Sequence, residues 1–258
     1  MRRLAVLAAL AAAATAGDLQ GLFPGGLDHP AIRYNSRPAH DAAAELNRNL
    51  RDGKVKLRFD PSYGYLPALL DALRVPVESQ MLVFSKTSVQ AQLIHTRNPR
   101  ALYFNDTVVV GYVRDGAILE VAAQDPELGT IFYVMHQAPA DVPLLDRRNS
   151  CLGCHESLGS LGVPGMLMRS VHTAADGQPV RPMGEFRTDH RSPMEQRWGG
   201  WFVSGKSGGA EHLGNTLFLN AGKTEAFLSA ETAAEYLTPH SDIVASRSSG
   251  TRFTWRTC

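Results

Sequence analysis

The clearest pattern of apolar positions lies in the middle of the chain and predicts antiparallel strands. Residues 108–113 and 117–123 are rich in β-branched and apolar side chains, and they flank Arg114-Asp115-Gly116, which is typical of a hairpin turn. After a break at Asp125-Pro126, residues 131–135 form a third run of the same kind. The pattern therefore predicts a three-stranded antiparallel meander.

Weaker patterns on either side predict short helices and strands. Helical spacing predicts one helix at 39–51, with Gly53 at its end, and a second at 65–73 with Pro67 in its first turn. Apolar alternation predicts a strand at 55–59. Further apolar runs predict strands at 81–84, 101–104 and 216–219, and helical spacing returns at 223–237.

The five residues Cys151-Leu152-Gly153-Cys154-His155 carry the most specific chemical signal. Two cysteines separated by two residues and followed at once by histidine are typical of a c-type haem attachment site. Each thiol can add to one haem vinyl group, and His155 then lies where the proximal iron ligand is needed.

Other interpretations of this motif fit the chain less well. A thioredoxin-like redox pair needs a βαβ context, and a zinc site needs a second ligand pair at suitable spacing. The flanks are instead rich in Pro and Gly, and the chain has only 3 cysteines, which makes a chance match less plausible. The motif therefore predicts one covalently bound haem c.

The first 16 residues are typical of a secretory signal peptide. Arg2 and Arg3 precede an apolar run at 4–14 that is too short for a permanent membrane span, and Ala14-Thr15-Ala16 resembles a cleavage site. A retained N-terminal anchor is the alternative. We expect a periplasmic or secreted protein with no membrane span after signal removal, which agrees with haem c attachment outside the cytoplasm.

Composition and charge bound the partners and the domain organisation. Loss of Arg2 and Arg3 leaves 24 basic against 25 acidic residues, a balance that favours neither nucleic acid nor an anionic membrane as partner. A small cytochrome domain needs roughly 100 residues. The chain that remains after removal of the signal peptide is much longer than one such domain. We therefore predict an N-terminal α+β region at 17–138 and a haem c-binding region at 139–258.

The haem region itself shows little regular pattern. No apolar-faced helix precedes Cys151, and Gly159, Gly162, Pro164 and Gly165 follow His155. The predicted fold class is therefore α+β, with an antiparallel β-meander region followed by an irregular, loop-rich haem c region that is not a standard small cytochrome c fold.

The sixth iron ligand remains open in the sequence. Met, His or no protein ligand can stand there, and an open position would allow chemistry on a small molecule. The candidates downstream of the motif are Met166, Met168, His172, Met183, His190, Met194 and His212. We favour His190 because the polar stretch 188–193, which ends in Pro, predicts an ordered loop that could orient an imidazole.

Aromatic and basic residues nearby are candidates for haem packing. Trp198 and Trp201, on either side of two glycines, can pack against the porphyrin, but residues 201–203 can equally be a core strand. Arg191 is a candidate partner for a haem propionate, together with Arg187 and Arg197.

Several stretches together resemble a known family: 81–88, 99–106, 188–193, 197–201 and 212–215. They are similar to exported mono-haem c-type cytochrome-domain proteins of planctomycete- and acidobacteria-like genomes. The resemblance implies a periplasmic haem c protein with an added N-terminal region and implies no particular activity. The family has a Thr-Gly-Thr-His-Gly run where this chain has Ser and Lys at 204–208, so only His190 and His212 lie within matching motifs.

Three functions are consistent with these observations. The first is a periplasmic electron carrier that serves an unidentified redox partner protein, with His190 as distal ligand. The second is a haem c enzyme or small-molecule binder with an open or displaceable distal site, acting on peroxide or a small nitrogen or sulfur compound. The third is a structural or sensing module, whose meander binds a partner protein while the haem reports the redox state.

Cys258 is the last residue of the sequence. It is either a free thiol or pairs with another chain.

Overall fold

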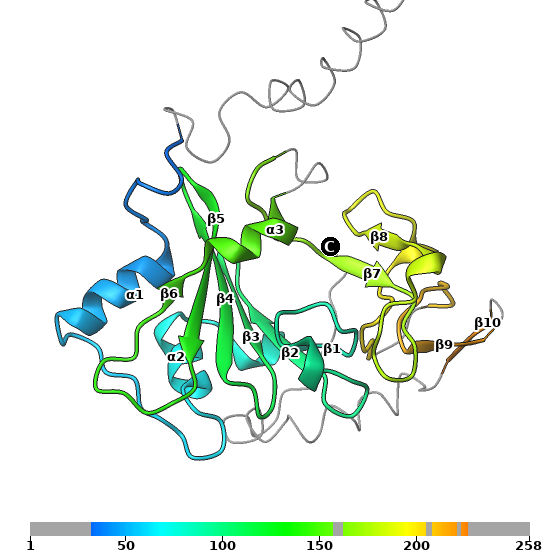
Figure 1. Ribbon diagram of the computed structural model, residues 1–258, viewed down its shortest axis with the longest axis horizontal. Coiled ribbons are helices and arrows are strands. Elements are labelled where there is room, and N and C mark those ends of the chain that lie inside the picture. The colour runs from blue at the N-terminus through cyan, green and yellow to red at the C-terminus, as the bar shows by residue number, and fades with distance from the viewer. Residues whose placement is uncertain (1–31, 157–161, 205–207, 221–222, 227–258) are drawn as a thin grey trace, which may run out of the picture.

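The centre of the structure, a computed structural model, is a six-stranded antiparallel sheet (Figure 1). The structure describes residues 32–156, 162–204, 208–220 and 223–226. The strands pair in chain order: β1 (Met81–Val83), β2 (Arg100–Phe104), β3 (Val108–Tyr112), β4 (Ile118–Asp125), β5 (Gly129–His136) and β6 (Asp146–Arg147). The predicted meander is confirmed as β3 to β5, and the sheet extends it at both edges.

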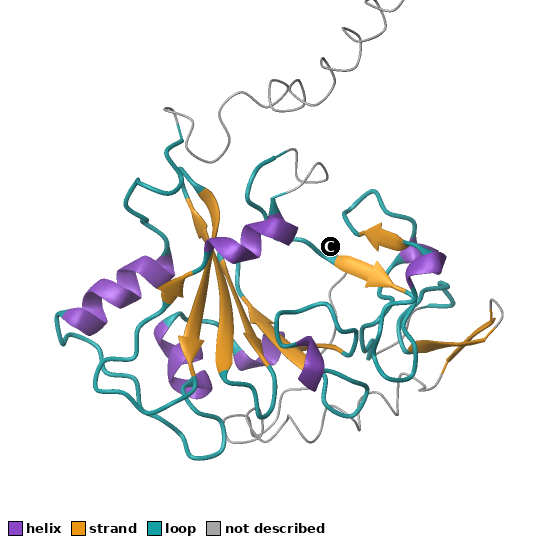
Figure 2. Ribbon diagram, in the orientation of Figure 1, coloured by secondary structure: helices purple, strands orange, loops and turns teal. Residues whose placement is uncertain are grey.

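One face of this sheet packs against two helices, α1 (Ala42–Arg51) and α2 (Leu66–Ala72), which are visible beside the strands in Figure 2. Burial alternates along β4, so that Leu119, Val121 and Ala123 enter the core while their neighbours are half-buried. Both helices contribute leucines to the same core. The predicted helices at 39–51 and 65–73 are therefore confirmed with slightly shorter bounds, and Gly53 follows α1 at φ 68°.

A buried carboxylate joins α1 to the sheet. Asp41 is 2% exposed, and its Oδ1 accepts hydrogen bonds from the backbone N–H groups of Ala43 (2.8 Å) and Ala44 (3.0 Å), which caps the helix. Its Oδ2 accepts a hydrogen bond from the hydroxyl of Tyr133 on β5 at 2.6 Å. Burial and then the Asp41 carboxylate raise the pKa of Tyr133, so this hydroxyl remains a donor.

The described residues after β6 are loop-rich, with a short helix and two pairs of short antiparallel strands. These elements are α3 (Leu152–His155), β7 (Arg169–Val171) paired with β8 (Glu185–Arg187), and β9 (Thr216–Asn220) paired with β10 (Lys223–Ala226). The predicted α+β class, a meander followed by an irregular region, is confirmed. Among the described residues, no helix is both long and apolar enough to cross a bilayer.

Backbone hydrogen bonds of Gly200 and Phe202 connect this loop-rich part to the outer edge of β1. The carbonyl of Gly200 accepts hydrogen bonds from the N–H groups of Phe84 (2.9 Å) and Ser85 (3.1 Å), and the N–H of Phe202 donates to Leu82 at 3.0 Å. Residues 201–203, predicted as a possible core strand, thus lie beside β1, although Trp201 forms only an isolated bridge with Val83.

Two predicted elements are wrong. Residues 55–59 form no strand, because their alternating side chains pack on the core cluster without a neighbouring strand to pair with. Residues 223–226 form β10 rather than the first turn of a helix, because the edge of β9 is available for pairing. The rest of that predicted helix, the predicted signal peptide and Cys258 lie outside the described residues.

We expect Asp41→Ala to lower the free energy of unfolding by about 2–4 kcal/mol, because it removes the cap of α1 and leaves the buried Tyr133 hydroxyl without an acceptor. Urea denaturation measures the change. Asp52→Ala, at an exposed ion pair with Lys54, is the control and should change stability far less, because solvent screens an exposed pair. Equal effects of the two substitutions would contradict the assignment.

Candidate haem-binding site

The cysteine motif lies on a short helical segment that begins directly after β6. A 3-10 turn at Asn149–Cys151 continues into α3, and Leu152 is buried against the core while Gly153 and Cys154 are exposed. Cys151 is half-buried and also packs on the core cluster. Both thiols are free. The packing of Leu152 therefore fixes the segment, with Cys154 on its exposed side and Cys151 partly covered by the core.

His155 is held in one orientation by a distant loop. Its Nδ1 lies 3.1 Å from the carbonyl oxygen of Gly165, and the N–H of Gly165 donates to the carbonyl of His155 at 3.1 Å. Because a carbonyl oxygen can only accept, Nδ1 carries the ring proton and Nε2 keeps its lone pair. The loop is in turn anchored to β5, since the N–H of Thr130 donates to the carbonyl of Pro164 at 3.2 Å.

The imidazole also contacts the sheet. The rings of His155 and Phe132 lie 4.4 Å apart between centroids, at an interplanar angle of 40°. Phe132 on β5 pairs with Ala122, one position away from Tyr133, so it projects from the face opposite to Asp41 and α1. Helices α1 and α3 thus cover opposite faces of the same sheet, and Figure 1 shows α3 crossing in front of the strands.

A charge pair lies on the same sheet face. Arg100 on β2 and Glu120 on β4 form an ion pair of 2.8 Å, and Glu120 also accepts hydrogen bonds from the side chains of Ser88 (2.5 Å) and Gln90 (3.2 Å). Burial lowers the pKa of His155, with a further lowering by Arg100. Burial also raises the pKa of the Cys151 thiol, and Glu120 adds to the effect. Both groups are therefore held mainly in their neutral forms.

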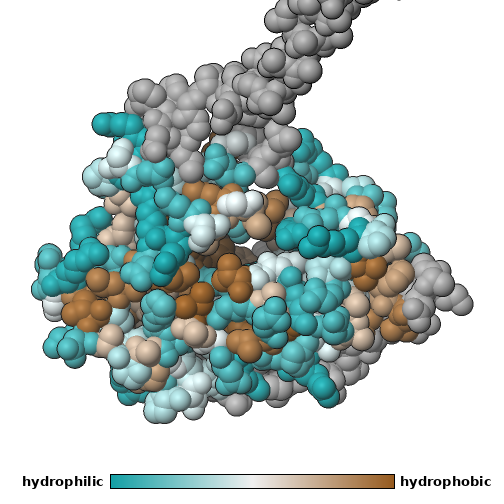
Figure 3. Space-filling model, in the orientation of Figure 1, coloured by the Kyte–Doolittle hydropathy of each residue, from teal (hydrophilic) through white to brown (hydrophobic). Residues whose placement is uncertain are grey.

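The donor set fits a c-type haem. The segment offers two free thiols at attachment spacing and an imidazole whose Nδ1 is bonded to a backbone carbonyl, the arrangement that fixes metal-ligating histidines. The sheet face here also carries half-buried apolar side chains, including Met81, Leu102 and Val109. Figure 3 shows apolar residues around a hollow just below α3. Among the described residues, no cluster of three or more His, Cys, Asp or Glu side chains is arranged to hold a bare metal ion.

The histidines considered as distal ligands lie in different environments. His190 is exposed, on a turn closed by the Asp189–Arg191 ion pair and by the side chain of Ser192, which accepts from the N–H of Asp189. His172 is half-buried, burial lowers its pKa, and its buried Nδ1 has no hydrogen-bond partner among the described residues. His212 accepts the N–H of Gly214 at Nδ1, at 3.0 Å, which places the proton of the neutral ring on Nε2.

The methionine candidates are mostly at the surface. Met166, Met168 and Met194 are 41%, 36% and 42% exposed, and Met183 is half-buried. The described residues show no hydrogen bond or ring contact between His155 and any of the seven candidate ligands.

The remaining predicted site residues are engaged with other parts of the chain. Trp201 is 6% exposed, and its Nε1 donates to the carbonyl of Arg169 at 2.8 Å. Trp198 is half-buried, has a φ of 71°, and its ring lies 6.0 Å from that of Trp201. Arg191 pairs with Asp189 and holds the pKa of that carboxyl at about 2.

Sequence reasoning missed three residues that shape this site: Phe132, Gly165 and Glu120. Phe132 and Glu120 lie in the predicted meander, where the alternation indicates a face but not what covers it. Gly165 acts through its backbone carbonyl, which no side-chain pattern reveals.

In comparisons with protein-family models, with curated proteins and with solved structures, no match to this chain is found. The family resemblance of the sequence motifs therefore stays a prediction.

In protein produced without haem, we expect the free energy of unfolding to decrease as the pH falls from about 6.5 through the folded-state pKa of His155. The folded-state pKa of this ring is lowered, so the unfolded chain binds the proton first and is favoured at lower pH. Urea denaturation between about pH 7.5 and pH 5 measures this slope. The lowered pKa values of His172 and His212 change the stability with pH in the same direction. The slope of the wild type is therefore compared with that of His155→Gln, which lacks only the contribution of His155. An equal slope in that variant would show that His155 is not the group responsible.

Proposed function

We propose that this protein is an exported c-type cytochrome that transfers single electrons, with one haem bound covalently through Cys151 and Cys154 and with His155 as proximal ligand. The observation that carries the proposal is the hydrogen bond from Nδ1 of His155 to Gly165 O, within a motif that already has haem c spacing. This bond orients the ring and leaves the lone pair of Nε2 available to a metal.

The surroundings of the cysteine motif suit haem attachment and electron transfer. The haem would supply one-electron exchange between ferric and ferrous iron. Leu152 and Phe132 hold the helical segment and the imidazole against the sheet. Burial keeps His155 neutral, the form that can donate a lone pair to a metal. Cys154 is exposed, so a group attached there is open to a redox partner protein. The predicted signal peptide supports a periplasmic or secreted location.

We expect wild-type protein, produced with a haem c maturation system, to show the pyridine haemochrome spectrum of a haem attached through two thioethers. The Cys151→Ser/Cys154→Ser double variant should lose covalent haem, because a hydroxyl does not form the thioether. The matched control is Cys258→Ser, which removes the third cysteine and should retain full haem content. Haem-free wild-type protein under these conditions would refute the proposal.

A second candidate function rests on the position of His190. The ligand that the sequence favours is exposed, and the turn that carries it is closed on itself by Asp189 and Arg191. If no other side chain reaches the iron, the distal position is open, and the protein binds or converts a small molecule instead of only carrying electrons.

Carbon monoxide distinguishes the two functions. For an electron carrier with both axial positions occupied by protein, we expect a low-spin reduced spectrum that carbon monoxide does not change. Substitution of the true distal ligand, tested in turn with His172→Ala, His190→Ala and His212→Ala, should then allow carbon monoxide to bind. His136→Ala, at the exposed end of β5, is the control. Immediate binding of carbon monoxide by the wild type would favour the small-molecule function.

A further inference from the structure

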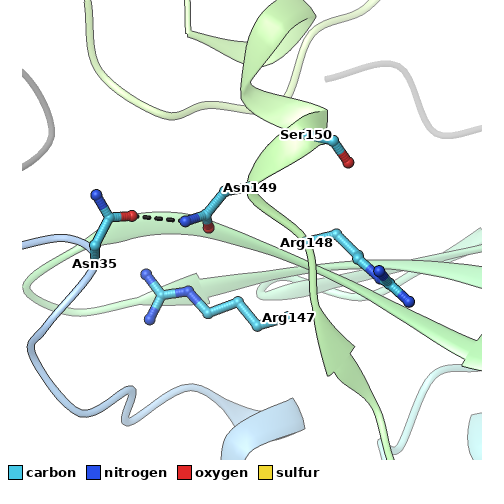
Figure 4. Close-up of a pocket in the computed structure, with 5 residues that line it drawn as sticks. All are labelled: Asn35, Arg147, Arg148, Asn149 and Ser150. Atoms are coloured by element: carbon cyan, nitrogen blue, oxygen red, sulfur yellow. Dashed lines mark hydrogen bonds between the residues drawn. The ribbon is translucent and has the colours of Figure 1, made fainter.

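A pocket of about 420 Å³ lies directly before the cysteine motif and has a distinct chemistry (Figure 4). It is lined by Asn35, Arg147, Arg148, Asn149 and Ser150. The lining offers two guanidinium groups, two amides and a hydroxyl, and it includes no carboxylate. Such a lining presents mainly hydrogen-bond donors and positive charge, so it suits a ligand that is anionic and accepts hydrogen bonds.

The first guanidinium is held rigidly. Arg147 lies at the end of β6, and its Nη2 donates to the carbonyl of Tyr34 at 2.5 Å while the guanidinium carbon lies 4.5 Å above the centre of the Tyr34 ring. Its Nε is buried without a hydrogen-bond partner among the described residues, so a ligand in the pocket could reach only the terminal Nη groups. A guanidinium carries five N–H donors, so these contacts orient the group without using all of its capacity.

The amides next to Arg147 are also fixed. The Nδ2 of Asn149 donates to the Oδ1 of Asn35 at 2.6 Å, and Figure 4 shows this hydrogen bond on the same side of the chain as the guanidinium of Arg147. Asn35 belongs to the segment before α1, and Asn149 to the turn that precedes Cys151. The pocket therefore joins two parts of the chain that are far apart in sequence.

The second guanidinium lies apart from the first. The backbone at Arg148 is extended, so its side chain leaves the chain on the side opposite to Arg147, the same side as Ser150 in Figure 4. Its side chain is 48% exposed, and its ion pair with Asp146 spans 3.7 Å, which is longer than a hydrogen bond. One pocket thus contains two separate cationic positions, of which the second is only weakly neutralised.

We propose that this pocket binds a small anion that carries two acidic groups, either carboxylates or phosphates. One acidic group contacts Arg147 and Asn149, and the other contacts Arg148 and Ser150. Charge-assisted hydrogen bonds to guanidinium groups are the strong interactions in such a site, and a ligand with a single acidic group could use only one of the two positions. The proposal does not depend on haem binding, so the two can fail separately.

Isothermal titration of the full processed protein tests the proposal with four probes: pyrophosphate, inorganic phosphate, succinate and acetate. We expect at least one of the two longer probes to bind about tenfold or more tightly than its shorter counterpart. Tight binding of pyrophosphate alone assigns the pocket to phosphates, and tight binding of succinate alone assigns it to carboxylates. Absence of binding, or equal affinity within both pairs, would overturn the proposal.

Matched variants separate a built site from general charge attraction. Arg148→Gln should weaken binding of the tighter probe about tenfold or more, because it removes one cationic position. Asn35→Asp keeps the acceptor for Asn149 but adds a negative charge, and it should weaken binding to a similar degree. The control is Arg58→Gln, at an exposed arginine that does not line the pocket, and circular dichroism checks that each variant is folded. Equal weakening in Arg148→Gln and Arg58→Gln would contradict the assignment.

Discussion

The close approach of three backbone segments at Gly199 and Gly200 is the constraint on which the loop-rich half of the molecule depends. A Cβ atom at position 199 would lie 2.5 Å from the carbonyl oxygen of Val171, and one at position 200 would lie 2.6 Å from the Cβ of Ser85. Gly200 also has a φ of 84°, which side-chain-bearing residues rarely adopt. Because both positions lack side chains, β7 can dock against the edge of β1, and the chain that follows the cysteine motif is held against the sheet.

The regular part of the fold was predictable because its signals are local. Runs of β-branched and apolar residues and the turn at 114–116 identify β3 and β4 without knowledge of their partners, and β5 shows a similar apolar run. The period-2 alternation at 55–59 predicted a strand that does not form, since a strand also needs a neighbour to pair with. Conversely, β6 consists only of Asp146 and Arg147, which show no strand pattern in the sequence. These two residues are a strand because they pair with β5.

The candidate site likewise contains residues that a local sequence signal predicts and residues that only the tertiary structure reveals. Spacing alone predicted Cys151, Cys154 and His155 as haem-attachment residues, because covalent attachment requires those residue types in that order. The groups that orient them come from tertiary structure: a carbonyl ten residues after His155, and an aromatic ring on a strand more than twenty residues before it. The polar stretch around His190 predicts a loop that could orient a ligand, but Asp189 and Arg191 pair with each other and the Ser192 hydroxyl accepts the backbone N–H of Asp189 within the turn.

The two outer strands of the sheet have a consequence for the behaviour of the protein in concentrated solution. A long unpaired strand at a sheet edge is a template on which another molecule can add a strand and begin aggregation. Here one edge ends in the two-residue, charged strand β6, and the other is covered by the backbone of residues 200–202. Within the described residues, neither end of the sheet therefore presents a long unpaired strand, and the segment that secures the loop-rich half also covers the edge of β1.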